Sequence, residues 1–150
     1  MPDKRYSDEL EHALARHDTD EMIQQLDAYA AYFAAGEGEW TDDFSEIITC
    51  HSDDPEKALA YVALGASRSD EPVFLAQLAC GPLEDVLRDP SSELLARIVA
   101  EARKSARFRW LLSHPFKVAV SDEAWAAIER FRMTGPHEEP SPDSLPPRSS

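Results

Sequence analysis

The sequence is poor in cysteine, glycine and long hydrophobic runs. Its 150 residues include only two cysteines and five glycines. Two cysteines cannot build a disulfide scaffold, and the N-terminal residues lack the apolar core of a secretion signal. The longest apolar runs span a few residues, far fewer than the roughly 20 that a membrane-spanning helix needs. We therefore expect a cytoplasmic protein that neither crosses nor binds a membrane.

Basic residues are also scarce, above all near the N-terminus. The chain has 15 Lys and Arg against 29 Asp and Glu, which gives a net charge of −14. Residues 1–57 hold 16 acidic and four basic side chains, whereas residues 58–133 hold ten of each. Such asymmetry repels nucleic acid and anionic lipid and speeds encounter with a basic protein. Acidic side chains also keep small proteins soluble, so the asymmetry alone does not require a partner.

Apolar residues recur at helical spacing along most of the chain. The clearest stretch runs from Met22 to Phe33, preceded by Asp18 and Glu21 in the pattern of a capping box and followed by Gly36. Further helix starts are marked by capping residues, namely Ser7, Thr41, Asp54, Ser69, Ser91 and Ser121. Strand-like alternation is limited to residues 116–120. The pattern predicts an all-α fold.

Two arrangements of these helices fit the sequence. Asp54-Pro55 and Asp89-Pro90 lie 35 residues apart, and the apolar positions that follow them roughly correspond. This spacing favours a short HEAT-like superhelix of helical hairpins. Two weakly similar copies of an amphipathic pattern are equally compatible with a compact multi-helix bundle. We predict one helical domain over residues 1–133 with either arrangement.

The last 17 residues differ in composition from the rest. Residues 134–150 contain five prolines and four serines, with Leu145 as the one sizeable apolar side chain. Such a segment buries too little apolar surface to offset the entropy of ordering. We predict a disordered Pro/Ser-rich tail, although its proline spacing would also suit docking into an aromatic groove.

Catalytic and metal-binding patterns are weak. Cys50 and His51 are adjacent on the chain, which does not easily place a thiol beside its base, and no second cluster supplies further zinc ligands. Glu84 and Asp85 point about 100° apart on a helix. We predict no catalytic residue, metal or cofactor, and keep an enzyme with a site near Cys50 and His51 or Glu84 and Asp85 as the alternative.

The main basic cluster lies in the second half of the chain and consists of Arg97, Arg103, Lys104, Arg107 and Arg109. Such a cluster could bind phosphates, but the overall negative charge argues against nucleic acid. Glu93 and Arg97 have the spacing of a helix-surface ion pair. We expect the cluster to face the acidic N-terminal helices.

Residues 80–112 carry a family resemblance. They read CGPLEDVLRDPSSELLARIVAEARKSARFRWLL, with a Gly-Pro-Leu-Glu-Asp motif, a helix rich in Ile, Glu and Ala, and a closing Leu pair. This pattern resembles an uncharacterised bacterial family known only as a domain of unknown function. The stretch from Asp54 to Val62 and the Trp40 to Phe44 region are similar to its N-terminal half. The resemblance covers about residues 40–113, implies a helical fold and carries no activity.

These observations together favour a non-catalytic, acidic protein-binding domain of the adaptor, regulatory or immunity-protein kind. Its expected partner is a basic protein, and no feature of the sequence sets the oligomeric state. The candidate partner-binding residues are aromatic and acidic, namely Tyr32, Glu37, Glu39, Trp40, Asp42 and Asp43.

Overall fold

The computed structural model describes residues 7–36 and 42–148. Its helices are α1 (Asp8–Leu14), α2 (Thr19–Ala34), α3 (Ser45–Thr49), α4 (Pro55–Arg68), α5 (Pro72–Leu78), α6 (Glu84–Arg88), α7 (Ser92–Lys104), α8 (Ala106–Leu112) and α9 (Asp122–Ile128). Shorter turns are η1 (Asp42–Phe44), η2 (Ala79–Leu83), η3 (Lys117–Ala119), η4 (Glu129–Phe131) and η5 (Pro142–Ser144). No strand occurs in the described residues, which confirms the all-α prediction.

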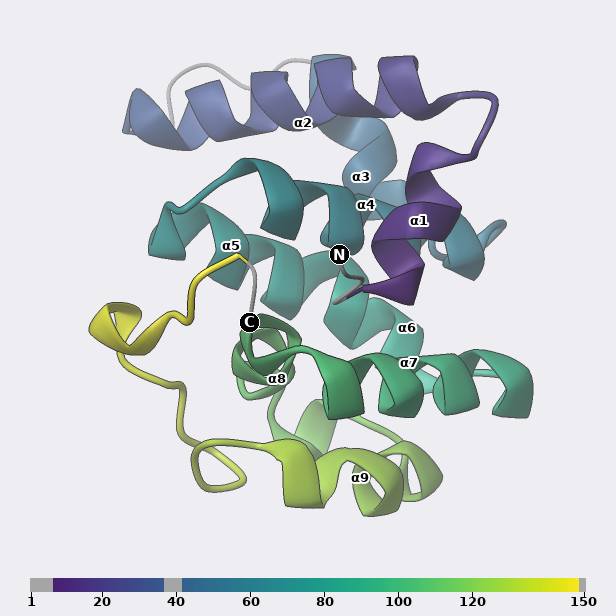
Figure 1. The fold of residues 1–150 in the computed structure, drawn as a ribbon, viewed down its shortest axis with the longest axis vertical. Coiled ribbons are helices and arrows are strands. Elements are labelled where there is room, and N and C mark those ends of the chain that lie inside the picture. Colours follow the sequence, from purple (N-terminus) through teal and green to yellow (C-terminus); the bar gives the residue numbers. More distant parts are fainter. Residues whose placement is uncertain (1–6, 37–41, 149–150) are drawn as a thin grey trace, which may run out of the picture.

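The helices form a compact bundle stacked along the long axis of the molecule. Figure 1 shows α2 at one end, α4 and α5 in the middle, and α7 to α9 at the other end. α1 is not part of this stack. It packs against the side of α4 and also contacts α7. The acidic first part of the chain and the basic α7 therefore become neighbours.

α4 is the central helix of this bundle. Eight consecutive residues from Ala58 to Gly65 are buried, because α1, α2, α5, α6 and η2 all contact this helix. A helix that is apolar on all sides is stable in water only when it is surrounded in this way. α4 thus fixes the relative positions of the N-terminal helices and the rest of the domain.

Four of the predicted capping residues set helix starts, whereas Ser69 does not cap α5, whose N-cap residue is Glu71, and Thr41 lies outside the described residues. The side chains of Ser7, Asp54, Ser91 and Ser121 each accept a hydrogen bond from a backbone N–H in the first turn of the helix that follows. Asp18 precedes α2 without capping it, so the predicted capping box is wrong. Its carboxylate instead binds Arg16 and Lys57, which offer charge as well as hydrogen bonds.

The Gly-Pro-Leu-Glu-Asp stretch continues the helical path from α5 into α6. α5, η2 and α6 follow one another with helical dihedral angles at Leu78, Leu83 and Glu84. Pro82 lacks the N–H of a regular α-helix and its ring would crowd a preceding carbonyl. The wider π-helical turn η2 accommodates this proline, so Gly81 is not used as a turn.

The C-terminal segment also differs from its prediction as a disordered tail. Residues 134–148 follow the surface of the bundle, and Pro140 is buried while Leu145 packs against the core. Arg107 and Trp110 on α8, and Asp70 in the loop between α4 and α5, supply polar contacts to this segment. Composition did not predict this packing, because the side chains that bind the segment lie elsewhere in the chain.

Candidate protein-binding face

The structure describes part of the predicted partner-binding set. Tyr32 lies half-buried in the second half of α2, and Asp43 is exposed on η1. Of Asp42 only the backbone is described, and Glu37, Glu39 and Trp40 lie outside the described residues. Contacts between α2 and η1 place the surroundings of Tyr32 and Asp43 on one side of the molecule.

One stripe of α2 leads from its first turn to Tyr32. The stripe consists of Glu21, Gln24, Gln25, Ala28 and Tyr32, whose spacings of three and four residues place them on the same helix face. The other four residues of the stripe line an open hollow of about 400 Å³. Asp43 of η1 lines its opposite side. We call these six residues the α2–η1 face. It combines carboxylates and amides with one aromatic side chain.

An aromatic cluster beneath this face holds η1 against α2. The ring of the buried Phe44 lies 5.1 Å from that of Tyr32 and 4.9 Å from that of Tyr29. Tyr29 in turn meets the ring of Phe74 on α5 edge-on at 5.9 Å. Buried aromatic side chains contribute large contact areas with few rotatable bonds. The face is therefore supported by a rigid layer.

Several other N-terminal acids are paired within the domain. The Lys57 ammonium lies 3.1 Å from a carboxylate oxygen of Asp18 and 2.9 Å from one of Glu46. The hydrogen bond from Arg16 is the main reason that the pKa of Asp18 lies far below its ordinary value. Among the described residues, Asp20 and Glu21 form no ion pair of this kind. Their negative charge remains available at the surface.

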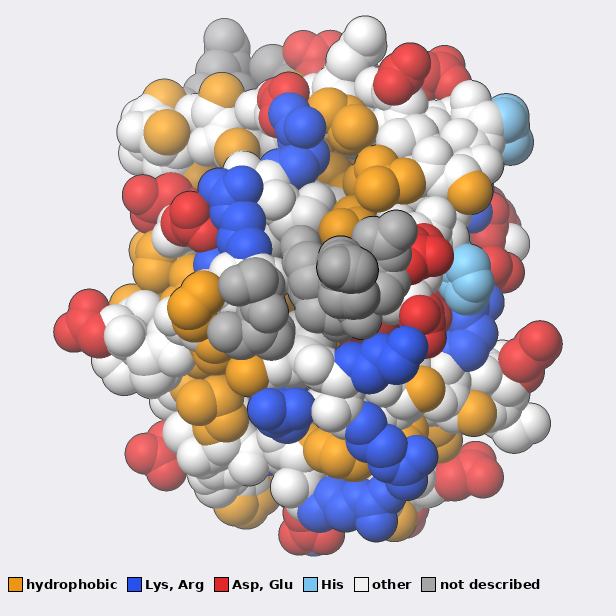
Figure 2. All heavy atoms as spheres, viewed as in Figure 1, with side chains coloured by type: hydrophobic (Ala, Val, Ile, Leu, Met, Phe, Trp, Pro, Cys, Tyr) orange, Lys and Arg blue, Asp and Glu red, His pale blue; other side chains and the backbone are white. Residues whose placement is uncertain are grey.

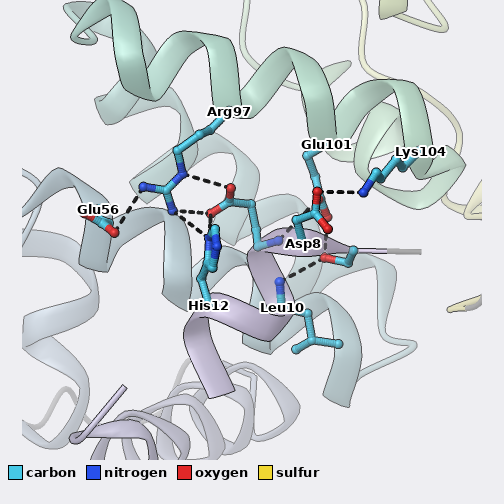
Figure 3. Close-up of polar contacts among 9 residues, drawn as sticks. Asp8, Leu10, His12, Glu56, Arg97, Glu101 and Lys104 are labelled. Carbon is cyan, nitrogen blue, oxygen red and sulfur yellow. Dashed lines mark hydrogen bonds and ion pairs between the residues drawn. The ribbon is translucent and has the colours of Figure 1, made fainter. Parts of the chain in front are cut away.

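A second polar network docks α1 onto α7 (Figure 3). Arg97 binds both carboxylate oxygens of Glu9, through Nε at 3.0 Å and Nη2 at 2.6 Å. Its third nitrogen lies 3.1 Å from Glu56 on α4, so one guanidinium joins three helices. The pairing with Glu9 raises the pKa of Arg97 further above its ordinary value. A bidentate guanidinium pair fixes both distance and orientation.

The other half of this network surrounds Glu101. Ser7 Oγ donates to its carboxylate, and Glu9 N lies 3.4 Å from the second carboxylate oxygen. Burial raises the pKa of Glu101, since it disfavours the charged form. Lys104, one turn further on, holds Asp8 at 2.6 Å. Figure 3 shows these groups converging from α1 and α7.

The basic cluster thus divides between several roles. Arg97 and Lys104 face the acidic first helix, as expected. The expected pair of Glu93 with Arg97 is wrong, because Glu9 and Glu56 hold the guanidinium. Arg107 is buried and binds Asp70 and nearby carbonyl groups instead.

Charged side chains are unevenly distributed over the surface. Figure 2 shows acidic side chains along the edge formed by α2, and basic side chains gathered over the half formed by α7 to α9, where acidic side chains also lie around the outline. Residues 92–133 hold eight Lys and Arg against five Asp and Glu. The molecule therefore has an acidic end despite the internal ion pairs.

The residues of the enzyme alternative are only partly brought together. His51 Nδ1 lies 3.4 Å from Asp85 Oδ2 and donates a hydrogen bond to the Ile48 carbonyl at 3.1 Å. Glu84 forms an ion pair with Arg88, in which Oε2 lies 3.6 Å from Nη2. Cys50 is buried, and burial is the main cause that raises the pKa of its thiol to about 12. A thiol with that pKa is a poor nucleophile near neutral pH.

The described residues provide neither a metal-binding cluster nor a membrane-spanning helix. Across residues 7–36 and 42–148, no group of three or more His, Cys, Asp and Glu side chains is arranged to hold a metal ion. None of the described helices combines the length and apolar character needed to cross a bilayer.

Sequence reasoning missed the buried charges Glu9, Glu101 and Arg107. A signal for one of them exists in the sequence. Glu101 lies three residues after Ile98 and next to Ala102, so helical periodicity puts it on the inward face of α7. An acid on such a face predicts a buried polar contact, but its partners Ser7 and Glu9 lie more than 90 residues away.

Comparison with known proteins identifies the family of the chain. A family model described as a family of unknown function (DUF6869) matches residues 32–135. The chain belongs to this family, and the match extends beyond residues 40–113, where the sequence resemblance was seen. Neither the curated proteins nor the solved structures contain a significant match.

Proposed function

We propose that the chain is a non-catalytic protein-binding domain whose α2–η1 face binds a basic segment of a partner protein in the cytoplasm. The observation that supports this proposal is the hollow between Glu21, Gln24, Gln25 and Asp43 at the acidic end of the molecule. Carboxylates at its rim attract Lys and Arg, and the amides offer both donors and acceptors.

The surroundings of this face suit a specific rather than a purely electrostatic contact. Tyr32 presents an aromatic ring beside the acidic rim, and Lys or Arg side chains pack favourably over such rings. The aromatic layer under η1 keeps the rim residues in place before the partner arrives. A preformed face binds at a smaller cost in lost side-chain freedom.

Two kinds of protein fit this description. An adaptor or regulatory domain would use the face for a moderate and reversible contact. An immunity-like inhibitor would use it to capture a cationic toxin, where long-range attraction raises the association rate. Association that slows steeply with added salt favours the second kind.

A peptide titration followed by NMR tests the proposed face. The probe is a Lys/Arg-rich peptide added to the isotopically labelled full chain at low salt, with a Glu/Asp-rich peptide of equal length as the control. We expect amide shifts of Glu21, Gln24, Gln25, Ala28 and Asp43 to change with the basic peptide alone. Equal changes on the first turn of α9, at Asp122 and Glu123, would show non-specific attraction and refute the proposal.

A further inference from the structure

The C-terminal segment packs along the helices as irregular chain around one short 3-10 turn. Residues 139–148 run back from the end of the bundle toward α5 and α8, as the yellow part of the ribbon in Figure 1 shows. The backbone angles of Ser141 (φ −64°, ψ 141°) and Leu145 (φ −60°, ψ 118°) lie in or close to the polyproline II region. Only the short turn η5 separates them. We call this segment the strap.

The helices bind the main chain of the strap. The indole nitrogen of Trp110 donates to the Ser141 carbonyl at 3.2 Å and lies 3.1 Å from the Ser144 hydroxyl. Arg107 Nε donates to the Pro146 carbonyl at 2.9 Å. Proline-rich peptides offer carbonyl groups and few N–H groups, so donors from Trp and Arg match what such a peptide presents.

Two side chains of the strap add anchors. Leu145 packs against the core, and the Arg148 guanidinium pairs with Asp70 at 3.0 Å and donates to the Ser67 carbonyl at 3.1 Å. Leu145 and Arg148 are three residues apart. Both anchors follow the turn η5 along the strap.

The groups that bind the strap are held in place by the body of the domain. Arg107 donates to the carbonyls of Ala66 at 2.7 Å and Ser69 at 2.8 Å, and it also pairs with Asp70. The Trp110 side chain is buried, with its ring 4.3 Å from that of His114. Contacts within the body of the domain therefore hold Arg107 and Trp110, in addition to their contacts with the strap.

The strap itself has few anchors for its length. It contributes one sizeable apolar side chain and one ion pair, and Arg148 and Asp70 are both largely exposed. Exposed ion pairs contribute about 1 kcal/mol or less. The strap stays bound largely because it is covalently attached to the domain. A short tether supplies an effective concentration in roughly the millimolar range.

We propose that the groove lined by Arg107, Trp110, Asp70 and Ser67 is a recognition site for proline-rich peptides and that the strap is its resident occupant. The partner segment is rich in Pro and Ser, with a Leu anchor and an Arg three residues later. Such a partner binds by displacing the strap. The site is separate from the α2–η1 face and does not depend on the function proposed for it.

A displacement experiment tests this site in the full chain. The probe is a synthetic peptide with the sequence of residues 139–150, and Leu145→Asp weakens the strap in the protein. We expect the Leu145→Asp protein to bind the peptide at least tenfold more tightly than the wild type, with a shift of the Trp110 indole N–H signal. Val118→Asp, a matched change at a side chain that is 82% exposed, leaves the affinity at the wild-type value.

Two outcomes would overturn the proposal. One is a folded Leu145→Asp protein that does not bind the peptide. The other is equal binding of a control peptide in which the Leu is replaced by Asp, because the anchor would then be irrelevant.

A second version covers the case in which Leu145→Asp does not fold. A protease site inserted between Gly135 and Glu138 of the full chain allows the strap to be cut after folding. We expect helicity to persist after cleavage and the cut strap to exchange with labelled peptide. Loss of helicity on cleavage, or a cut strap that never exchanges, would show that the segment is a fixed part of the core.

Discussion

Asp18 and Glu101 are both shielded carboxylates, yet their surroundings shift their pKa values in opposite directions. Asp18 receives hydrogen bonds and charge from Arg16 and Lys57, which lower its pKa. Glu101 lies among Ser7, Glu9 and Asp8, where burial and like charges raise its pKa. Sequence alone did not distinguish them, because the partners that decide each shift come together only in the fold.

Replacing Asp18 tests the first of these environments. Since the folded-state pKa is lowered, its contribution to stability is present above the ordinary pKa of about 4 and is lost as the pH falls. We expect Asp18→Asn to lower the free energy of unfolding by about 1–3 kcal/mol at pH 7. Urea denaturation at pH 7 and pH 3 measures the difference, which should shrink at the lower pH. A cost that does not change with pH would contradict the assigned ion pairs.

Replacing Glu101 should change the stability with the opposite dependence on pH. A raised folded-state pKa makes the wild-type protein lose stability as the pH rises through that value. Glu101→Gln keeps the shape and removes the titration. We therefore expect the unfolding free energy of the variant, relative to the wild type, to increase between pH 4 and pH 8. Urea denaturation at four pH values measures this difference in unfolding free energy. A difference that does not change with pH would contradict the raised pKa assigned to Glu101.

At the scale of helices, local signals predicted the ends and long-range packing decided the rest. Ser7, Asp54, Ser91 and Ser121 cap helices as expected, because a cap requires only neighbours within three residues. Ser105 separates α7 from α8, and its side chain caps α8. The binding of the C-terminal strap depends on distant contacts and was not predictable from local pattern.

Two helical glycines offer a direct test of how tightly α4 is packed. A Cβ added at Gly65 would lie 2.2 Å from Leu78 Cδ1, whose side chain is fully buried. Ala is favoured over Gly in helices by about 1 kcal/mol, but overpacking costs about 1–3 kcal/mol. We expect Gly65→Ala to lower the melting temperature.

The matched control is Gly81→Ala in the π-helical turn. A Cβ at this position meets no atom within 4 Å. The higher helix propensity of Ala should then be the main effect of the substitution. The melting temperature should be equal to or above that of the wild type. Thermal unfolding followed by circular dichroism compares the two variants. A Gly65→Ala protein as stable as the Gly81→Ala protein would mean that α4 and α5 are less closely packed than described.

For the whole molecule, the sequence predicted the acidic end but not how it is formed. The count of acids before residue 58 indicated an electronegative N-terminal part. Folding then pairs several of those acids with Arg16, Lys57, Arg97 and Lys104. Asp20 and Glu21 of α2 are among the acids that stay exposed and outside these ion pairs. Only the tertiary arrangement separates the acids that hold the fold together from those that face outward.

The claim that α2 carries the binding surface can be tested by reversing charges at two equivalent places. Asp20 and Glu21 are exposed in the first turn of α2, and Asp122 and Glu123 are exposed in the first turn of α9. Both pairs meet the same kind of helix N-terminus, so substitution by Lys costs the two helices similar stability. The α9 variant is therefore a matched control for fold and net charge.

The decisive measurement is the affinity of each double variant for the same Lys/Arg-rich peptide by calorimetry at low salt. We predict that Asp20→Lys with Glu21→Lys weakens binding about tenfold or more, because each exposed charge pair contributes up to about 1 kcal/mol. Asp122→Lys with Glu123→Lys should change the affinity by less than about twofold. Equal losses in the two variants would show that net charge alone attracts the peptide and would contradict a binding face on α2.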